Sequence, residues 1–241
     1  MIRIENIVTP SPAQWERIIM GMRNPKNSWD KSDSYTTHIE DPETLQTADF
    51  EFFVGENDLK LMQQLSHAGR DHRKYIRMIP VYMDIIAPMF WWKEFDTYKV
   101  GTVKNSCSTM HKIHVKEFTY DDFTHEGIDE VTKVFPLLKI QFEEYVETLE
   151  WLRVRFNETQ DKKYWRALIE MLPSNYNMRA TVFLDYEVLA NMYHARKNHP
   201  LDEWKVLCER IEDLPYSEVI TGKPIVTDKK CDIPNEKSTE K

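Results

Sequence analysis

Residues Leu172–Arg196 read LPSNYNMRATVFLDYEVLANMYHAR and hold the most informative pattern of the chain. Pro173 comes just after residues 164–171, where the apolar spacing predicts a helix, and proline is common past a helix end. A further helix is predicted over 180–197, before Pro200. The stretch therefore indicates two helices joined by a turn that contains proline.

The helix expected over 180–197 carries a polar stripe. Glu187, Asn191 and His194 lie at positions i, i+4 and i+7, and Arg196 lies near the helix end. Polar stripes on helices are usually solvated faces. A neutral Asn aligned with His and Arg beside apolar residues could equally line a ligand pocket. Both interpretations are open at this point.

Hydrophobic spacing predicts the other elements outward from this stretch. Towards the N-terminus we expect a strand in the first ten residues, a helix beginning at Ser11, a long loop over 24–47, a short helix over 59–65 capped by Asp58, and a buried strand over 76–87. Apolar residues recur every three or four positions over 138–156, which predicts a long amphipathic helix. One more helix is expected over 201–211.

The composition excludes several classes of function. Only 6 of the 241 residues are glycine, and the chain has no glycine-rich nucleotide loop and no nucleophile-elbow motif. A net charge of −8 argues against a nucleic acid polymer as partner, because such binding depends on clustered Lys and Arg. A small anionic ligand needs only a few local cations. A nucleotide would therefore have to be held by side chains.

Cysteine usage and hydropathy indicate the compartment. The three cysteines, Cys107, Cys208 and Cys231, lie far apart and form no even disulfide framework. No apolar run approaches the ~20 residues that span a bilayer, and the N-terminus lacks a signal-peptide pattern. We expect a soluble, cytoplasmic protein without membrane contact, with a single domain over 1–226 and a disordered charged tail over 227–241.

One short motif has the residue types of a metal site. Cys107, His111 and His114 form C-x-x-x-H-x-x-H, and Cys and His are the usual zinc ligands. The spacing matches no standard zinc site, and no second ligand pair lies nearby in the sequence. We therefore expect no metal and interpret the three residues as polar groups of a loop.

Two segments, 67–77 and 91–112, combine aromatic and charged residues. The second interleaves Trp91, Trp92, Phe95 and Tyr98 with Lys93, Glu94, Asp96 and Lys99. Aromatic rings beside cations suit a flat heterocycle that carries phosphate. A packed aromatic wedge under a solvated loop explains the same pattern equally well.

The strongest functional signal is the order of several spaced residues. An ungapped C-terminal series comprises Leu172, Pro173, Asn175, Arg179, Leu189, Asn191 and Arg196. Upstream, His72 precedes a strand over 78–87 and a helix that begins at Pro88. This order resembles the flavin-dependent thymidylate synthases, which have R-H-R-x-x-S and S-x-R after such a helix, then L-P-x-N and N-x-R-x-L-x-N-x-x-x-x-R. The two matching blocks, 58–112 and 164–212, cover about half of the chain.

The chain departs from the family pattern at most of its cationic positions. The segment TYKVGT stands where the family has R-H-R-x-x-S, so the matching residues are Thr97, Tyr98, Lys99 and Thr102. After a one-residue insertion Ser108 fits the family's second serine, but Met110 stands at the next arginine, with His111 and Lys112 beside it. Asp185 and Glu187 stand where Asn and Arg are typical. Lysine in place of arginine loses the fork that grips a phosphate.

The resemblance implies a fold, a cofactor and a set of binding residues. The implied fold is α/β (α+β), with a mixed sheet flanked by long helices. The implied cofactor is FAD, with NADPH and methylenetetrahydrofolate as co-substrates, dUMP or a related pyrimidine nucleotide as substrate, and a homotetramer as the assembly. The implied cofactor-binding residues are His72, Thr97, Tyr98, Lys99 and Asn191. The implied substrate-binding residues are Glu94, Ser108, Lys112 and Arg196.

The resemblance also implies a reaction without an enzyme nucleophile, so no catalytic residue is assigned. The expected reaction is the reductive methylation of dUMP at C5, in which the flavin mediates the transfer and the protein orients it. The replaced motif leaves an alternative open, because a fold does not fix a function. That alternative is a pyrimidine-nucleotide-binding or regulatory protein that keeps the fold without flavin chemistry.

Overall fold

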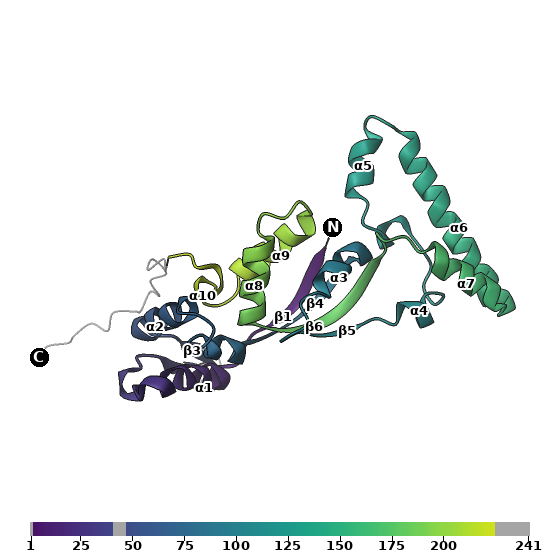
Figure 1. Cartoon of the computed structure of the whole chain (residues 1–241). Helices are drawn as coiled ribbons and strands as arrows, with labels where there is room; N and C mark the ends of the chain where they lie inside the picture. Colours follow the sequence, from purple (N-terminus) through teal and green to yellow (C-terminus); the bar gives the residue numbers. More distant parts are fainter. Residues whose placement is uncertain (1, 41–46, 225–241) are drawn as a thin grey trace, which may run out of the picture.

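A four-stranded antiparallel sheet forms the centre of the computed structural model, which describes residues 2–40 and 47–224 (Figure 1). The strands follow the order β1-β4-β6-β5 across the sheet. Their bounds are Arg3–Val8 for β1, Pro80–Pro88 for β4, Asn177–Asp185 for β6 and Val103–Ser106 for β5. The predicted tail over 227–241 lies outside the described residues.

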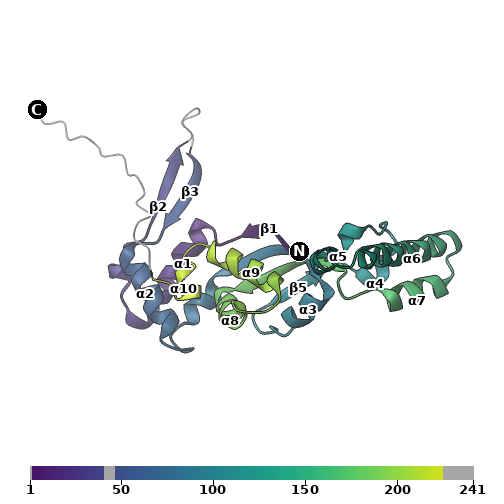
Figure 2. The same ribbon diagram turned by 90° about the horizontal axis from the view of Figure 1, so that it is seen from above.

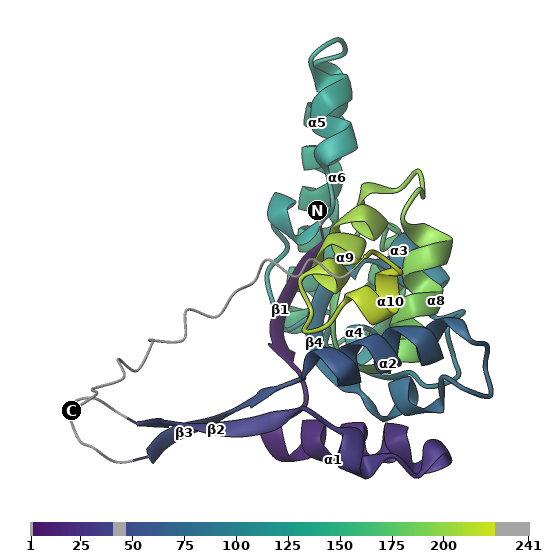
Figure 3. The same cartoon turned by 90° about the vertical axis from the view of Figure 1, so that its left-hand side faces the viewer.

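The α/β fold class is confirmed, but the sheet is not mixed. All pairs between described strands are antiparallel, and β4 pairs with β6 along its whole length, from Pro80 opposite Asp185 to Pro88 opposite Asn177. Parallel sheets need cover on both faces, whereas an antiparallel sheet can leave one face to solvent. The helices here cover one face of the sheet, as Figure 3 shows for α3 (Met89–Phe95), α8 (Tyr186–Arg196) and α9 (Asp202–Glu212).

Alternating side chains separate the two faces of the sheet. Val81, Met83 and Ile85 of β4 and Val182 and Leu184 of β6 are buried under the helices. Their neighbours in sequence point to the other face, as the period of two in a strand requires. The aromatic side chains Trp91, Trp92 and Phe95 of α3 belong to the same core. The packed-wedge interpretation is therefore confirmed for these three residues, and they are too buried to stack on a ligand.

The N-terminal part adds two helices and a hairpin. Helix α1 (Pro12–Arg23) begins at Ser11, as predicted, and the Ser11 side chain and Gln14 form a capping box. Helix α2 (Glu56–His67) is longer than the predicted 59–65 segment and has Gly55, not Asp58, as its N-cap. The short helix α10 (Glu218–Thr221) packs near α2 and α8.

The long loop predicted over 24–47 is wrong. It contains two short 3₁₀ turns and then the strand β2 (Tyr35–Glu40), which pairs with β3 (Thr47–Phe53) in a hairpin. The hairpin projects from the body of the molecule (Figure 2). Threonine and tyrosine favour strands even where the segment is polar overall, so polarity alone was a misleading guide here.

A helical arm extends from the other end of the sheet (Figures 1 and 2). It consists of α5 (Glu126–Thr132), α6 (Leu137–Thr159) and α7 (Lys162–Met171), with α4 (Thr109–Lys112) at its base. The helices predicted over 138–156 and 164–171 are thus confirmed. The arm has its own cluster of buried apolar residues, separate from the core of the sheet. None of the described helices is long and apolar enough to cross a membrane.

Two predicted elements change at their ends. The helix predicted over 180–197 is a strand up to Asp185, and only α8 is helical. Asp185 ends the strand and caps the helix, because its side chain accepts a hydrogen bond from the Val188 N–H. The strand predicted over 76–87 begins later, at Pro80, after a 3₁₀ turn over 74–78. Proline is tolerated at the first residue of a strand, where its missing N–H costs least.

Candidate functional site

The loop after α3, which holds the TYKVGT segment, lies against the N-terminal end of α8. Gly101 has a φ of +79°, and a Cβ at this position would lie 2.8 Å from Val188 Cγ2 and 2.9 Å from Asp185 Oδ2. Only glycine fits both the backbone angle and the close approach. The start of α8 is therefore in contact with the segment that the resemblance relates to the cofactor.

Glu187 of α8 is neutralised by two arginines from the segment between α2 and β4. Arg73 Nε lies 2.9 Å from Glu187 Oε1, and Arg77 Nε lies 2.6 Å from Glu187 Oε2. The Glu187 side chain is only 12% exposed. The interpretation of Glu187 as part of a solvated stripe is therefore wrong, because its carboxylate is mostly buried and forms ion pairs with Arg73 and Arg77.

Asp185, the second acid at this end of α8, has a raised pKa. Burial of its carboxyl is the main cause, and the charge of Glu187 adds to it. Hydrogen bonds from the backbone of Val188 and Glu187 and the charge of Arg77 act in the opposite direction. Burial therefore reduces the negative charge that Asp185 can present to a ligand.

The remaining predicted cofactor residues belong to the three segments that meet here, namely the segment before β4, the TYKVGT loop and α8, although Tyr98 lies at the other end of α8 beside Arg196. His72 precedes Arg73 and lines a cavity of about 540 Å³ together with Met22, Leu65, Tyr75 and Met78. Asn191 lies one turn beyond Glu187 on α8 and is exposed, as are Thr97 and Lys99 of the loop. Thr97 Oγ1 donates to the Glu94 carbonyl and shapes the turn after α3. Thr102 Oγ1 is buried and has no hydrogen-bond partner among the described residues.

At the other end of α8, Arg196 is held by residues of α3 and of the loop that follows it. Arg196 Nη1 donates to Glu94 Oε2 at 2.9 Å, and its Nε donates to the Tyr98 hydroxyl at 3.0 Å. Trp204 Nε1 donates to the same Glu94 oxygen at 2.9 Å, and the Arg196 guanidinium lies 4.7 Å from the Trp204 ring centre. His199 Nε2 lies 3.4 Å from that oxygen. We call Glu94, Tyr98, Arg196, His199 and Trp204 the Arg196 cluster.

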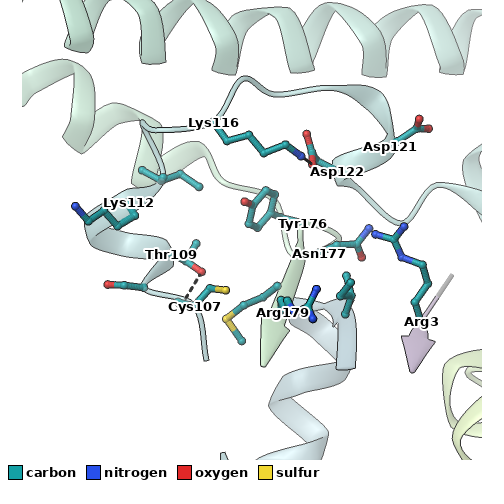
Figure 4. A pocket seen from close by; sticks show the side chains of 14 residues that line it. Arg3, Cys107, Thr109, Lys112, Lys116, Asp121, Asp122, Tyr176, Asn177 and Arg179 are labelled. Carbon is teal, nitrogen blue, oxygen red and sulfur yellow. Dashed lines mark hydrogen bonds and ion pairs between the residues drawn. The ribbon is translucent and has the colours of Figure 1, made fainter. Parts of the chain in front are cut away.

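The other two predicted substrate residues lie in a different cavity, which Figure 4 shows. Ser108 and Lys112 line this cavity of about 470 Å³ at the base of the arm. Cationic side chains from β1, β6 and the segment after α4 join them, namely Arg3, Arg179 and Lys116. The cavity shares no residue with the Arg196 cluster. The described chain therefore places the predicted substrate residues in two separate half-sites.

Hydrogen bonds fix part of the second cavity. Arg179 Nη2 donates to Asp84 Oδ2 at 2.7 Å, and Thr181 and Asn6 donate to the same carboxylate. These hydrogen bonds, from Thr181 first, lower the pKa of Asp84 to about 2. Lys116 forms an ion pair with Asp122. Burial raises the pKa of Tyr176, which lines the cavity, to about 12, so its hydroxyl stays protonated.

Sequence patterns missed several residues of these sites. Arg3 comes from the first strand, far from any motif, and only the sheet pairing brings it beside Ile86 and the second cavity. Arg73 and Arg77 lie in the basic segment 67–77 that the sequence singled out, but nothing in the sequence relates them to Glu187. Trp204 has no signal in the sequence beyond its place in the helix predicted over 201–211. A signal existed for Arg179, which belongs to the ungapped C-terminal series.

The metal-site motif does not assemble. Cys107 is exposed, and the His114 ring packs edge-on against Phe156 with ring centres 5.0 Å apart. Among residues 2–40 and 47–224 no group of three or more His, Cys, Asp or Glu is placed to hold a metal ion. The three residues thus give no geometric support to a metal-dependent reaction.

Comparison with known proteins identifies the fold. No protein-family model and no curated protein matches the sequence. Among solved structures, thymidylate synthase X (ThyX) from Helicobacter pylori with FAD and dUMP is similar, at 16% identity and a TM-score of 0.59 over 91% of this chain and 95% of that chain. The UMP/dUMP methylase PolB from Streptomyces cacaoi, bound with 5-Br dUMP, is similar at 14% identity and a TM-score of 0.61 over 92% and 95%. The chain has the fold of the flavin-dependent thymidylate synthases.

Proposed function

We propose that this protein is an FAD-dependent enzyme that methylates a pyrimidine nucleotide. The proposed reaction is the reductive methylation of dUMP at C5, with methylenetetrahydrofolate as carbon donor and NADPH as reductant. The observation that carries the proposal is the Arg196 cluster. It joins Arg196 of the C-terminal series to Glu94 and Tyr98 of the aromatic helix and its loop, two segments about a hundred residues apart in the chain. These are residues that the family resemblance relates to the substrate and the cofactor.

The residues around the start of α8 fit a flavin nucleotide. Lys99 is an exposed donor in the loop that contacts α8, His72 is exposed and precedes Arg73 in the chain, and Asn191 offers an exposed amide on that helix. Thr102 Oγ1 is a buried hydroxyl without a hydrogen-bond partner in the described part of the chain, and such groups usually mark a missing interaction. When bound, FAD would supply the redox chemistry that amino acid side chains lack. The role of these residues would be to hold and orient the cofactor.

The two half-sites suit the two ends of a pyrimidine nucleotide. Arg3, Lys112 and Arg179 around the second cavity could bind a phosphate, with the Ser108 hydroxyl as a further donor. In the Arg196 cluster, the Glu94 carboxylate, a hydrogen-bond acceptor, lies beside the Arg196 guanidinium, a hydrogen-bond donor. That pair matches the N3–H and a carbonyl oxygen on the edge of uracil. We propose that the base is recognised at the Arg196 cluster and the phosphate at the second cavity.

We propose a homotetramer in which a second copy of the chain brings the half-sites together. The uncovered face of the sheet supports an assembly, because an apolar row crosses all four strands. Val8 is paired with Tyr82, Tyr82 with Phe183, and Phe183 with Val103. Val8, Tyr82 and Val103 are 56%, 48% and 62% exposed. Contiguous apolar surface of this kind usually marks an interface.

The most direct test is the absorbance spectrum of the purified full-length protein. We expect a flavin band at ~450 nm, either on isolation or after incubation with FAD, and a spectral shift when dUMP is added. FAD should also raise the melting temperature, because a ligand that binds only the folded state stabilises it. A colourless protein that gains no band and no stability with FAD would contradict the proposal. Conversion of dUMP to dTMP with both co-substrates would then complete the assignment.

The alternative is a nucleotide-binding or regulatory protein without flavin chemistry. It is favoured by Met110 and Thr97 at positions where the family has arginine, and by the acids Asp185 and Glu187. Tight binding of dUMP without FAD, abolished by Arg196→Ala, would support it. Arg210→Ala is a suitable control, because Arg210 is half exposed and its ion pair within residues 2–40 and 47–224 is with Asp213 alone. Rescue of a thymidine-requiring strain would eliminate this alternative.

A further inference from the structure

Two arginines share one carboxylate at the start of α8, although one would be enough to neutralise it. Arg73 and Arg77 reach Glu187 from the segment between α2 and β4, each through its Nε atom. Glu187 is 12% exposed, Arg73 is 23% exposed and Arg77 is 42% exposed. One ion pair with Glu187 would be enough to hold the segment before β4 against α8. The second adds a positive charge, and the Arg77 side chain that carries it is partly open to solvent.

The shortest contact to Glu187 is made by Nε in both arginines, so the outer end of each guanidinium, between its two Nη atoms, is not used by this carboxylate. Within the described chain, Arg73 Nη1 and Nη2 have no hydrogen-bond partner, and Arg77 Nη2 makes one long hydrogen bond of 3.4 Å to the Arg70 carbonyl. An arginine held in this way keeps a planar pair of donors that matches phosphate oxygens. Glu187 thus fixes the two side chains and reduces the entropy that a ligand would otherwise have to remove.

The surroundings favour an anionic ligand. Residues 70–77 contain four basic side chains, Arg70, Arg73, Lys74 and Arg77, against the single acid Asp71. The TYKVGT loop, with exposed Lys99, contacts the same end of α8 through Gly101. Arg77 is also close enough to Asp185 to affect its ionisation. The site therefore combines cations from two segments around the acids of α8.

We propose that Arg73 and Arg77, held by Glu187, bind the pyrophosphate of the flavin dinucleotide. The proposal rests on the proposed function and adds to it the residues that replace the missing motif arginines. In this arrangement the cations come from the segment before β4, and the acid on α8 orients them. The positive charge that the family places in its motif and on α8 is thus supplied by Arg73 and Arg77 of the segment before β4.

The test is flavin binding to the full-length protein, measured by quenching of flavin fluorescence. FAD is the ligand, and riboflavin, which has no phosphate, is the comparison. We expect Arg73→Gln and Arg77→Gln each to weaken FAD binding at least tenfold, because a charge-assisted hydrogen bond to phosphate is lost. Riboflavin binding should change less than twofold. Added salt should weaken FAD binding to the wild type more than to the variants.

Controls separate this proposal from loss of folding and from failure of the proposed function. Arg210→Gln should leave FAD binding unchanged. In the single variants, glutamine keeps a hydrogen-bond donor for Glu187. The triple variant Arg73→Gln, Arg77→Gln, Glu187→Gln leaves no unpaired carboxylate at this position. We expect this triple variant to fold and to bind FAD weakly. Two results would overturn the role of the arginines and leave the flavin function standing. The arginine variants could bind FAD as tightly as the wild type does, or the wild-type protein could bind FAD and riboflavin with equal affinity. A wild-type protein that binds neither flavin overturns both.

Discussion

At the scale of single residues, the partner of a side chain decides its effect more than its type does. Glu187 looks repulsive to an anionic cofactor in the sequence, because arginine is typical at its position in the family. In the structure it is paired with Arg73 and Arg77, so its charge is more than balanced. Sequence reasoning could predict that a charge had changed on this helix. It could not predict the compensation, because the partners lie more than a hundred residues away.

Gly101 offers a sharp test of the contact between the TYKVGT loop and α8. Gly101→Ala combines a positive φ with a Cβ less than 3 Å from Val188 and Asp185. We expect a loss of about 1–3 kcal/mol in the free energy of unfolding, together with weaker flavin binding. Chemical denaturation measures the first and flavin titration the second. Gly127→Ala is the control, because Gly127 lies in α5 with nothing within 4 Å of its Cβ position, and alanine favours a helix there. Equal stability of the two variants would contradict the contact.

Asp58 should control the stability of the N-terminal part in acid. Its burial acts to raise its pKa, but hydrogen bonds from Ser32, Ser34 and Arg23 outweigh this and lower the pKa below its ordinary value. Arg23 Nε lies 2.5 Å from Asp58 Oδ1, and both side chains are buried. Because the folded pKa is lowered, the contribution is present above the unfolded pKa of about 3.9. It is lost as the pH falls through the folded pKa.

The matching variant is Asp58→Asn, which leaves the Arg23 charge buried without a counter-ion. At pH 7 it should reduce the free energy of unfolding by about 3–5 kcal/mol. Denaturation curves between pH 7 and pH 3 should show the difference from wild type shrinking only below about pH 4. Asp30→Asn is the control, because Asp30 is exposed. A difference that is constant over the whole range would exclude a linked proton at Asp58.

At the scale of elements, long helices could be predicted and paired strands could not. The helices α6, α7 and α9 follow from apolar spacing, since a long periodic pattern has few competing explanations. The helix predicted over 180–197 includes most of strand β6, although Ala180, Val182 and Leu184 alternate with Arg179 and Thr181. The identity of β6 depends on β4 and β5, which flank it. A short apolar run does not say which neighbours it will find.

The arm provides a prediction at this scale, because its apolar core is separate from that of the sheet. Leu149 of α6 is completely buried in the arm core. Leu149→Ala should destabilise the arm by about 2–5 kcal/mol. Hydrogen exchange should then speed up in α6 and α7 while β4 and β6 keep their protection. Leu137→Ala, on the same helix but 47% exposed, should have little effect. Equal acceleration in β4 and β6 would show that arm and sheet unfold as one unit.

At the scale of the whole molecule, only some of the site residues expected from the sequence are in contact with one another. Glu94, Tyr98 and Arg196 meet in one cluster, whereas Ser108 and Lys112 line another cavity. Sequence could supply the residues, because each has a place in a spaced motif. It could not say which belong to the same pocket of one chain, because that depends on how the sheet and the arm separate the motifs.

If each complete site takes one half from each of two chains, two damaged variants should repair each other. Arg196→Ala damages the half at the Arg196 cluster, and Lys112→Ala damages the half at the second cavity. We expect each variant alone to bind dUMP weakly. Co-expressed chains should regain wild-type affinity in about a quarter of the sites, because random mixing joins the two intact halves at that frequency. Titration calorimetry of the whole co-expressed population, with both chains expressed equally, measures that fraction. Co-expression of Arg196→Ala with Glu94→Ala, which damage the same half, should restore no dUMP binding. If the mixture of Arg196→Ala and Lys112→Ala regains no dUMP binding either, the whole site lies within a single chain.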